Sequence, residues 1–411
     1  MTHKIAIIGA GPSGCFLAQA LGKSCPDAQI TIIDQMLVPY GLVRYGVAAD
    51  HQGTKAVVRQ FARLFEKQGV VFAGNLCIGD DGSGDLTYGE LQDMFDVVVL
   101  ATGLSQDRRL GLSGEDLPQV YGSGRVTRYW NDHPNDQALA PEFGRQVVVV
   151  GNGNVAIDVV RILAKGARDF EGSDFDASRV VTAVDEIHIV GRSAANLAKF
   201  DAVMVRELAK IQGLAVRLDA PLKDVGDDKR LMALSETVMA ASPDAPQTVL
   251  TFHFGWAPEA VCTDQGAVAG VVFQSADGAL KTLDCDSIVT AIGFDDTRRP
   301  FVGDDEGAIG NGLYCAGWFK RGPRGTIPEN RQDSQKVAQR IAADIAGSGS
   351  DISKSGEAAL YSRFGKKIVT YRDWLAIDSA EQAAATEGRC RMKLKTIEDM
   401  LDVVNERRTM E

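Results

Sequence analysis

The chain has 411 residues, a length typical of two or three domains, and its hydrophobic content of 45% suffices for well-packed cores. The formal net charge of -11 argues against general nucleic-acid binding, which usually needs a basic surface. The seven cysteines are scattered and never spaced as C-x-x-C, so we expect no disulfide framework, no thioredoxin-type redox pair and no metal or iron–sulfur site. An odd, unclustered set of thiols favours the reducing cytoplasm.

Targeting signals point the same way. No run of about eighteen apolar residues occurs, so we expect no membrane span. The first strand pattern begins at Lys4, without the charged and apolar regions of a secretory signal. An organelle presequence that had been removed would leave no trace in this sequence.

Short apolar runs rich in β-branched residues recur along the chain and alternate with helical patterns. They lie at residues 4–8, 30–33, 97–103, 147–150 and 186–191. Continuous runs of this length are typical of parallel strands buried on both faces, and their alternation with helices predicts doubly wound α/β modules. The polar stretches 83–86 and 167–178 are expected to be loops or inserts. Residues 347–357 are expected to form a linker before a terminal helical region.

A glycine-rich turn with the sequence G-A-G-P-S-G follows the first strand directly. Such a turn lets the backbone approach a pyrophosphate, and the helix behind it offers its N–H groups and the positive end of its dipole to the anion. Asp34 lies twenty residues past the turn, at the end of the next strand, where it can accept hydrogen bonds from both ribose hydroxyls. The residues of this predicted dinucleotide site are Gly9, Gly11, Pro12, Ser13, Gly14 and Asp34.

A second turn, G-N-G-N-V-A, also follows a strand. The residues predicted to bind a dinucleotide there are Gly151, Asn152, Gly153, Asn154 and Val155. The partner strand ends in Arg192 and Ser193 and carries no acid. A carboxylate there would repel a 2′-phosphate, whereas an arginine binds one bidentately, so we predict NADPH at the second turn. The alternative is that Arg192 is a solvated surface arginine.

Two nucleotide modules in one chain indicate a flavin and a nicotinamide, because hydride transfer requires a protein that holds the two rings face to face. The sequence A-T-G that ends at Gly103 supports this pairing. We predict an α/β fold with two Rossmann-like dinucleotide-binding domains, in which the NADP domain is inserted in the FAD domain. The FAD domain is expected to comprise residues 1–104 and 295–411, and the NAD(P) domain residues 105–294.

Three blocks of the sequence resemble the adrenodoxin reductase-type ferredoxin–NADP reductases, which are glutathione reductase-like flavoproteins. The blocks are LVPYGLVRYGV at 37–47 followed by Asp50 and His51, GNGNVAIDVVR at 151–161, and LYCAGWFKRGPRGTI at 313–327. They occur in family order over nearly the whole chain. The resemblance implies an enzyme that takes a hydride from NADPH onto FAD. It also implies that single electrons pass to a [2Fe-2S] ferredoxin serving a cytochrome P450, an oxygenase or an iron–sulfur pathway.

The resemblance assigns further flavin-side residues. Ser13, Asp34, Gly41, Leu42 and Ile78 stand where the family holds FAD, and Trp318, Gly325, Thr326 and Ile327 stand where it lines the isoalloxazine ring. We expect a helix to begin at Gly325 and to reach Ile345, so that its N-terminus faces the flavin. A glycine that only turns the chain into a helix is the alternative.

Two catalytic residues follow from the same resemblance. His51 and Asp158 match family positions credited with proton handling near the flavin and the nicotinamide. A histidine titrates near neutrality, and a carboxylate can hold its tautomer. The alternatives are a turn histidine that caps backbone groups and an acid favoured by the helix dipole.

The chain departs from the family at the predicted phosphate site. The family usually carries two adjacent arginines where this chain has Arg192 and Ser193, so one cation is lost. Glu207 matches a family acid near that phosphate, after a three-residue insertion. These differences predict NADPH as the electron donor and leave use of NADH open as well.

The resemblance also implies an acidic [2Fe-2S] ferredoxin that docks on basic residues of the NADP domain. The matching residues are Arg206, Lys210, Lys229 and Arg230. Electrostatic steering would raise the association rate and make it salt-dependent. Solvated helix charges are the alternative explanation for these residues.

Two other functions share part of this pattern. A flavoprotein subunit of a larger enzyme, such as the small subunit of glutamate synthase, would carry an N-terminal cysteine cluster that this sequence lacks. A flavin-binding redox sensor without turnover would keep the first glycine turn but would not need an open nicotinamide site.

Overall fold

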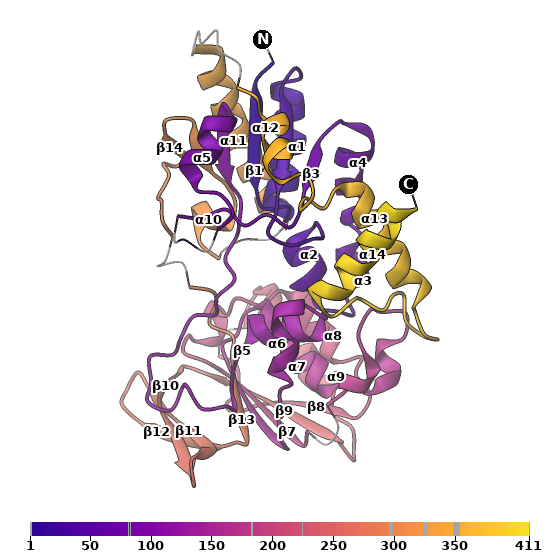
Figure 1. Cartoon of the computed structure of the whole chain (residues 1–411). Helices are drawn as coiled ribbons and strands as arrows, with labels where there is room; N and C mark the ends of the chain where they lie inside the picture. The colour runs from indigo at the N-terminus through magenta and orange to yellow at the C-terminus, as the bar shows by residue number, and fades with distance from the viewer. Residues whose placement is uncertain are drawn as a thin grey trace.

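The computed structural model describes residues 2–80, 82, 84–181, 184–223, 225–295, 299–323, 325, 327–347 and 354–410. Two six-stranded sheets organise this part of the chain, and they lie in the upper and lower halves of Figure 1. The first has the strand order β14-β15-β4-β1-β2-β3, and the second has the order β5-β13-β6-β7-β9-β8. A smaller antiparallel sheet has the order β10-β11-β12.

The strands of the first sheet are β1 (Lys4–Ile8), β2 (Gln29–Ile33), β3 (Val71–Ala73), β4 (Val97–Leu100), β14 (Ala308–Gly310) and β15 (Leu313–Cys315). Those of the second are β5 (Val120–Gly122), β6 (Gln146–Val150), β7 (Glu186–Gly191), β8 (Leu214–Leu218), β9 (Thr248–Phe254) and β13 (Ser287–Thr290). The third sheet consists of β10 (Trp256–Asp264), β11 (Ala267–Ser275) and β12 (Leu280–Asp284). In the two large sheets every pair is parallel except β14 with β15.

The α-helices are α1 (Pro12–Ser24), α2 (Gly41–Tyr45), α3 (Gln52–Lys55), α4 (Val58–Lys67), α5 (Tyr88–Met94), α6 (Ser123–Trp130), α7 (Asn154–Ala164), α8 (Ala202–Leu208), α9 (Lys229–Ala240), α10 (Trp318–Arg321), α11 (Ile327–Gly347), α12 (Glu357–Phe364), α13 (Tyr371–Ala383) and α14 (Ile397–Thr409). Four short 3-10 helices are η1 (Pro134–Leu139), η2 (Ala167–Phe170), η3 (Ala177–Arg179) and η4 (Ala195–Leu197). We call the first sheet with the helices packed on it the first module, and the second sheet with its helices the second module.

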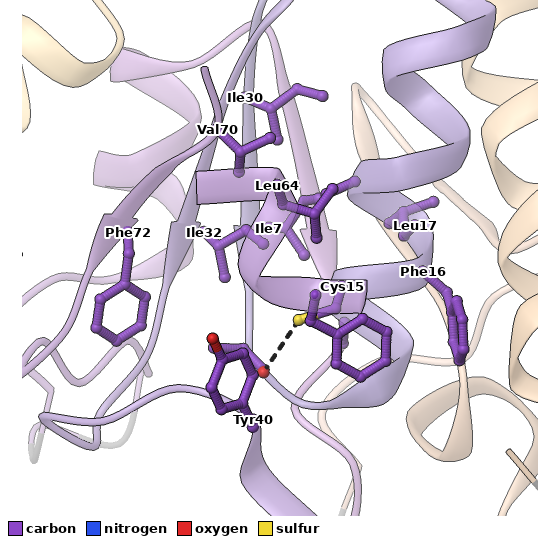
Figure 2. Close-up of a cluster of buried hydrophobic side chains, with 14 of the residues drawn as sticks. Ile7, Cys15, Phe16, Leu17, Ile30, Ile32, Tyr40, Leu64, Val70 and Phe72 are labelled. Atoms are coloured by element: carbon purple, nitrogen blue, oxygen red, sulfur yellow. Dashed lines mark hydrogen bonds between the residues drawn. The ribbon is translucent and has the colours of Figure 1, made fainter. Parts of the chain in front are cut away.

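Successive side chains of the strands in the first sheet enter different cores. Helices therefore cover both faces of this sheet. Ile7 of β1 packs in a core with Leu17 of α1, as Figure 2 shows. Its neighbour Ile8 packs in another core with Leu91 of α5. Side chains alternate along a strand, so a strand that is buried on both faces needs a continuous apolar run. Full burial of each such side chain contributes about 1.5–3 kcal/mol.

The second sheet is buried in a different way on its two faces. Val149 of β6 packs with Ile157 of α7 in a helix-covered core. Val148 of the same strand packs with Phe273 of β11, so the small antiparallel sheet covers the opposite face. The fold is therefore the α/β architecture that the sequence predicts. The strands expected at 4–8, 30–33, 147–150 and 186–191 are confirmed, and the strand expected in 97–103 ends at Leu100.

Two predictions about connecting segments had mixed outcomes. Residues 167–178 contain η2 and the start of η3, and Asp174 and Phe175 within them are buried rather than solvated. The terminal helical region is confirmed as α12 to α14, while most of the linker expected before it lies outside the described residues. No helix in the described ranges is long and apolar enough to cross a bilayer.

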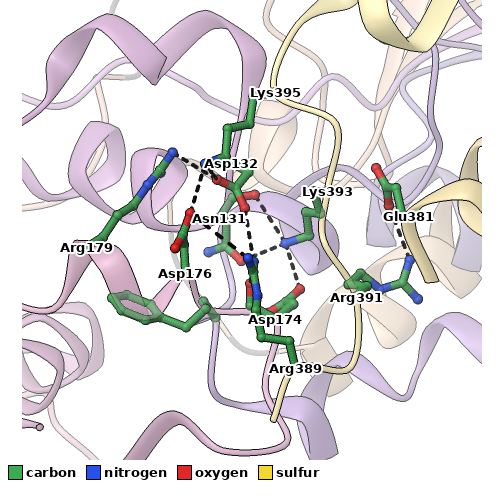
Figure 3. A network of polar contacts seen from close by, with 12 residues as sticks. Asn131, Asp132, Asp174, Asp176, Arg179, Glu381, Arg389, Arg391, Lys393 and Lys395 are labelled. Atoms are coloured by element: carbon green, nitrogen blue, oxygen red, sulfur yellow. Dashed lines mark hydrogen bonds and ion pairs between the residues drawn. The ribbon is translucent and has the colours of Figure 1, made fainter. Parts of the chain in front are cut away.

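A buried polar network ties the C-terminal segment to the second module (Figure 3). The Lys393 ammonium, almost fully buried, lies 2.7 Å from the Asp174 carboxylate and donates to the carbonyl oxygen of Asn131 at 3.1 Å. Lys55 of α3 reaches the same acid at 3.0 Å. Removing one partner from a buried ion pair is strongly destabilising, so this network fixes the two modules and the C-terminal segment relative to one another.

Candidate active site

The first glycine turn is shaped by close contact with the neighbouring strand end. Gly9 has a φ of +110°, and a Cβ atom there would lie 2.5 Å from the carbonyl oxygen of Ala101. Its N–H donates to Ile33 at 2.7 Å, which fixes the turn against β2. Only glycine satisfies both the backbone conformation and the contact.

The helix behind this turn leaves its N-terminal N–H groups available to an anion. Gly11 is the N-cap of α1, no side chain caps the helix, and its first turn contains no acid. By contrast, Thr370 caps α13 with its own hydroxyl. Gly41 packs against the turn, because a Cβ on it would lie 2.9 Å from the Gly11 Cα. An uncapped helix N-terminus behind a glycine turn is an arrangement that can bind a phosphate.

Asp34 is built into the first turn. Its carboxylate accepts hydrogen bonds from the N–H groups of Ala10 at 2.7 Å and Met36 at 2.8 Å. Burial raises the pKa of Asp34 to about 6, and these two donors oppose that rise. The acid that the sequence places beside a ribose is therefore already held in position by the backbone.

The second turn repeats the geometry of the first. Gly151 has a φ of +128°, and a Cβ atom there would lie 2.2 Å from the carbonyl oxygen of Ala291. Its N–H donates to Val190 at 2.8 Å. Gly153 is the N-cap of α7, which also has no capping side chain, no acid in its first turn and open space around the Gly153 Cα.

The surroundings of the second turn differ from those of the first. Asn152 stands where Ala10 stands in the first turn, and its buried amide nitrogen has no hydrogen-bond partner among the described residues. Arg192 is exposed and has no ion-pair partner in the described ranges. The carbonyl oxygen of Ser193 accepts from Gly255 at 3.0 Å, which holds the end of β7 in place. Asn154 and Asp201 exchange two hydrogen bonds of 2.7 Å, which fix the start of α7.

The third block of the sequence packs against the start of α1. Gly317 has a φ of +67°, and a Cβ there would lie 1.9 Å from the hydroxyl oxygen of Ser13. Trp318 begins α10 and contacts Phe294 with 5.6 Å between ring centroids. Its buried indole nitrogen has no hydrogen-bond partner in the part of the chain that is described. A partnerless buried N–H is the kind of group that a cofactor oxygen satisfies.

The remaining predicted cofactor residues fall at several places around the two turns. Pro12 and Gly14 lie in the first turn of α1, Leu42 lies in α2, Ile78 packs at the edge of a core of the first module, and Gly103 follows β4 with a φ of +67°. Val155 is 38% exposed at the start of α7. Gly325 has a φ of +92° and Ile327 begins α11, so the predicted helix starts two residues later than expected; Thr326 lies outside the described residues.

His51 and Asp158 meet at the boundary between the two modules. The His51 ring nitrogen Nδ1 lies 3.5 Å from the Asp158 carboxylate. Its Nε2 lies 3.0 Å from the carboxylate of Glu207. Burial raises the pKa of Asp158, and the nearby cation of Arg161 opposes that rise. The two residues predicted to be catalytic therefore lie together, with a third acid beside them.

Glu207, which the resemblance places near the phosphate, has its contacts at this boundary. Its carboxylate contacts His51 and lies 3.7 Å from Nε of Arg161. Arg161 also binds Asp50; both residues belong to the blocks that carry the resemblance, but neither was assigned a role in the site. Such contacts between the modules join residues that lie more than a hundred positions apart in the sequence. The spacing of residues within one motif cannot predict them.

The predicted docking residues lie on α8, the turn after it and α9, and they differ in their availability. Lys210 and Lys229 are exposed without ion-pair partners in the described ranges. Arg206 pairs with Glu236 at 2.9 Å on the surface. Arg230 is committed to the fold, because its guanidinium binds Asp228 and donates to two carbonyl oxygens of the segment 196–198.

The residues at both turns fit dinucleotides. Each has an uncapped helix behind an open glycine turn, and the buried nitrogens of Asn152 and Trp318 are two donors without partners among the described residues. Within the same ranges no cluster of three or more His, Cys, Asp or Glu residues could hold a metal ion.

Known proteins resemble this chain over almost its whole length. A family model described as pyridine nucleotide-disulphide oxidoreductase matches residues 3–308. Cindoxin reductase from Citrobacter braakii is 43% identical and covers 98% of this chain and 91% of its own. The mitochondrial NADPH:adrenodoxin oxidoreductase of Arabidopsis thaliana is 30% identical, covering 97% and 94%.

A solved structure agrees in fold over almost the whole chain. The structure of FprA from Mycobacterium tuberculosis in complex with NADPH superposes with a TM-score of 0.89 at 28% identity, over 98% of this chain and all of the other. The family match, the relatives and this structure extend across both modules. The chain therefore belongs to the pyridine nucleotide-disulphide oxidoreductases, and among them to the adrenodoxin reductase-type NADPH–ferredoxin reductases, which are FAD-dependent enzymes.

Proposed function

We propose that this enzyme oxidises NADPH at the second module and delivers the electrons singly to a small [2Fe-2S] ferredoxin. One NADPH supplies a hydride, and two oxidised ferredoxins each take one electron, so NADP+, two reduced ferredoxins and one proton are formed. When bound, FAD accepts the hydride and can return the two electrons one at a time. The observation that carries the proposal is the pair of equivalent glycine turns, of which one is completed by Asp34 and the other by Arg192.

The first module is the FAD-binding part in this proposal, with residues 1–104 and 295–411 assigned to it and 105–294 to the NAD(P)-binding part. Asp34 would bind the ribose, and the N-terminus of α1 would bind the pyrophosphate. The indole N–H of Trp318 supports a role in orienting the flavin, because it is buried without a partner among the described residues. Gly41 and Leu42 of α2 would line the flavin side of the turn.

The second module would hold NADPH at the turn before α7. Arg192 is exposed and has no ion-pair partner in the described ranges. Its guanidinium would bind the 2′-phosphate through two parallel N–H donors. Ser193 adds one hydroxyl donor but no charge. A single cation at this position supports NADPH as the preferred donor and NADH as a weaker one.

His51 would manage the proton that the reaction releases. Its ring is held by acids on both sides, Asp158 at 3.5 Å and Glu207 at 3.0 Å, and its side chain is 18% exposed. A histidine that is held in this way and still reaches solvent can take up a proton and pass it to water. Asp158 and Glu207 would fix the orientation of the ring.

The α8–α9 face of the second module would dock the acceptor. Lys210 and Lys229 are exposed cations without ion-pair partners among the described residues, and Val203 on α8 is 68% exposed. A partly apolar surface with a basic rim suits a small acidic carrier protein. The described cysteines are all free thiols, which supports a cytoplasmic location.

The test is steady-state reduction of cytochrome c by NADPH with a panel of one-electron carriers. The rate should depend on an added [2Fe-2S] ferredoxin and should fall steeply as salt rises. A rate that is equally high without any carrier would overturn the proposal. Reduction of an FMN flavodoxin but of none of the ferredoxins would overturn the acceptor assignment while leaving NADPH oxidation in place.

A further inference from the structure

One buried arginine connects every acid that surrounds His51. Arg161 lies on α7 and is only 2% exposed. Its guanidinium binds both carboxylate oxygens of Asp50, one of them at 3.0 Å, and donates to Asp158 at 2.8 Å. Its Nε lies 3.7 Å from the carboxylate of Glu207. One cation on the second module thus contacts three acids.

These three acids define the position of His51. Asp158 and Glu207 contact the two nitrogens of its ring, and Asp50 precedes it in the chain. Asp50 belongs to the segment that leads from α2 to α3, and the neighbouring Ala49 is buried in the core of the second module. The backbone on the N-terminal side of His51 is therefore anchored to the second module, and its side chain is held by two acids from that module.

Charge balance explains why a guanidinium is needed here. Three carboxylates gathered around one guanidinium repel one another, and removing that countercharge from a buried position leaves unpaired charges. Lys165 offers a second cation at 2.6 Å, but its ammonium reaches only Asp50 among these acids. A planar guanidinium can bind two carboxylates in fixed directions, which an ammonium cannot do.

We propose that Arg161 is a positioning residue for the release of the proton when electrons pass to ferredoxin. It holds His51 between Asp158 and Glu207, across the boundary between the two modules. This inference rests on the proposed function, because it assumes that His51 manages the proton of that reaction. Arg161 acts through His51 and its acids and touches neither nucleotide in this account.

A purely mechanical role is the competing explanation, and the chain offers a matched control for it. Lys393 is also a buried cation, 3% exposed, and it ties the C-terminal segment to Asp174 and Asn131 of the second module. None of its contacts involves His51, Asp158 or Glu207 (Figure 3). Lys393→Met therefore weakens the attachment of the C-terminal segment and removes no direct contact of His51, Asp158 or Glu207.

The experiment measures the limiting rate at which the anaerobically reduced enzyme passes its electrons to a [2Fe-2S] ferredoxin, because the proton is released in this half-reaction and not in hydride transfer. It compares Arg161→Gln, Arg161→Lys, His51→Ala, the double variant of Arg161→Gln with His51→Ala, and Lys393→Met. Proton-handling groups typically contribute about a hundredfold or more, so Arg161→Gln should lower the rate by about tenfold or more. The Kd for NADP+ should stay within about twofold, since Arg161 makes no contact with the second turn.

The double variant separates positioning from mechanics. If Arg161 acts through His51, Arg161→Gln has no further effect once His51 is alanine, and Arg161→Lys recovers part of the rate. Lys393→Met should stay close to the wild-type rate. An equal loss in the His51→Ala background, or an equal loss in Lys393→Met, would overturn the proposal.

Two further measurements keep the proposal falsifiable. If Arg161→Gln does not fold, Asp50→Asn removes one partner and keeps the guanidinium, and its smaller loss should again vanish in the His51→Ala background. The NMR signal of the His51 ring, identified by its absence in His51→Ala, should shift in Arg161→Lys and stay in place in Lys393→Met. A signal unmoved in the Arg161 variant would contradict positioning. Failure of NADPH to reduce the wild-type flavin would instead contradict the proposed function itself.

Discussion

The two glycine turns have nearly the same backbone and opposite surroundings. Gly9 and Gly151 both have positive φ and both press against the carbonyl oxygen of an alanine after the adjacent strand. Asp34 closes the first turn with hydrogen bonds from the backbone, whereas Arg192 beside the second is exposed and has no ion-pair partner among the described residues. A preorganised acid suits a cofactor that stays bound, and a free cation suits a cosubstrate that exchanges in every turnover.

The largest expected effect comes from removing the acid of the first turn. Asp34→Ala leaves the N–H groups of Ala10 and Met36 without their acceptor, and each such group costs about 1–3 kcal/mol of folding stability. It also removes the proposed ribose contact. We expect the protein to be purified almost without flavin and to unfold at a lower temperature, as measured by the ratio of visible to ultraviolet absorbance and by calorimetry. Wild-type flavin occupancy in this variant would contradict the account.

Two glycines of the second turn should respond in opposite ways. Gly151→Ala forces a left-handed backbone and a contact of 2.2 Å with a carbonyl oxygen, so it should destabilise the fold by at least about 1–2 kcal/mol. Gly153→Ala introduces a methyl group into open space at an extended backbone, so stability should be unchanged. Its Kd for NADP+, from calorimetric titration, should nevertheless rise about tenfold or more if a pyrophosphate lies there. An unchanged Kd in Gly153→Ala would mean that no pyrophosphate binds at this turn.

Arg192→Ala should convert the second turn into a site without preference between the two nicotinamides. A charge-assisted bond contributes about 1.5–3 kcal/mol, so the KM for NADPH should rise by about tenfold to a hundredfold while the KM for NADH stays constant. Lys210→Ala is the matched control, because Lys210 is another exposed cation on the same module. Equal increases for both nucleotides would show that Arg192 does not bind the 2′-phosphate.

The smallest expected effect is a pH dependence confined to the first turn. Burial raises the pKa of Asp34 to about 6 in the apoprotein, so the protonated acid favours folding below its ordinary pKa and this contribution is lost as pH rises through 6. Ribose hydroxyls donate to the ionised form, so binding of FAD should release a proton. The affinity of the apoprotein for FAD should then fall by up to about tenfold for each pH unit below 6, and Asp34→Asn should abolish the trend. A flat profile in the wild type would contradict it.

Local features of the sequence were sufficient for the fold and for both turns. The apolar runs at β1, β2, β4, β6 and β7 have one physical cause, burial on both faces, and each can be identified without knowledge of its neighbours. The glycine turns are equally local, because a strand, a positive φ and a helix N-terminus fit within six residues. The helix that was expected from Gly325 begins at Ile327.

The contacts between the modules could not be predicted in this way. Glu207 was linked to the phosphate site through a motif, yet its partners His51 and Arg161 come from segments that only tertiary packing brings together. Asp174 lies in a stretch that reads as a solvated insert, and two buried lysines from distant segments pair with it. The antiparallel sheet β10–β12 was missed as well, since its role is to cover the face of the second sheet that helices leave open.

The most direct test of the central claim is anaerobic mixing of the FAD-loaded enzyme with NADPH and, separately, with NADH. We expect the flavin absorbance to bleach with both, with a rate that saturates at lower concentrations of NADPH than of NADH. In Arg192→Ala that difference should disappear while the limiting rates remain. Absence of bleaching with NADPH, or a preference that survives in Arg192→Ala, would contradict the assignment of the second turn.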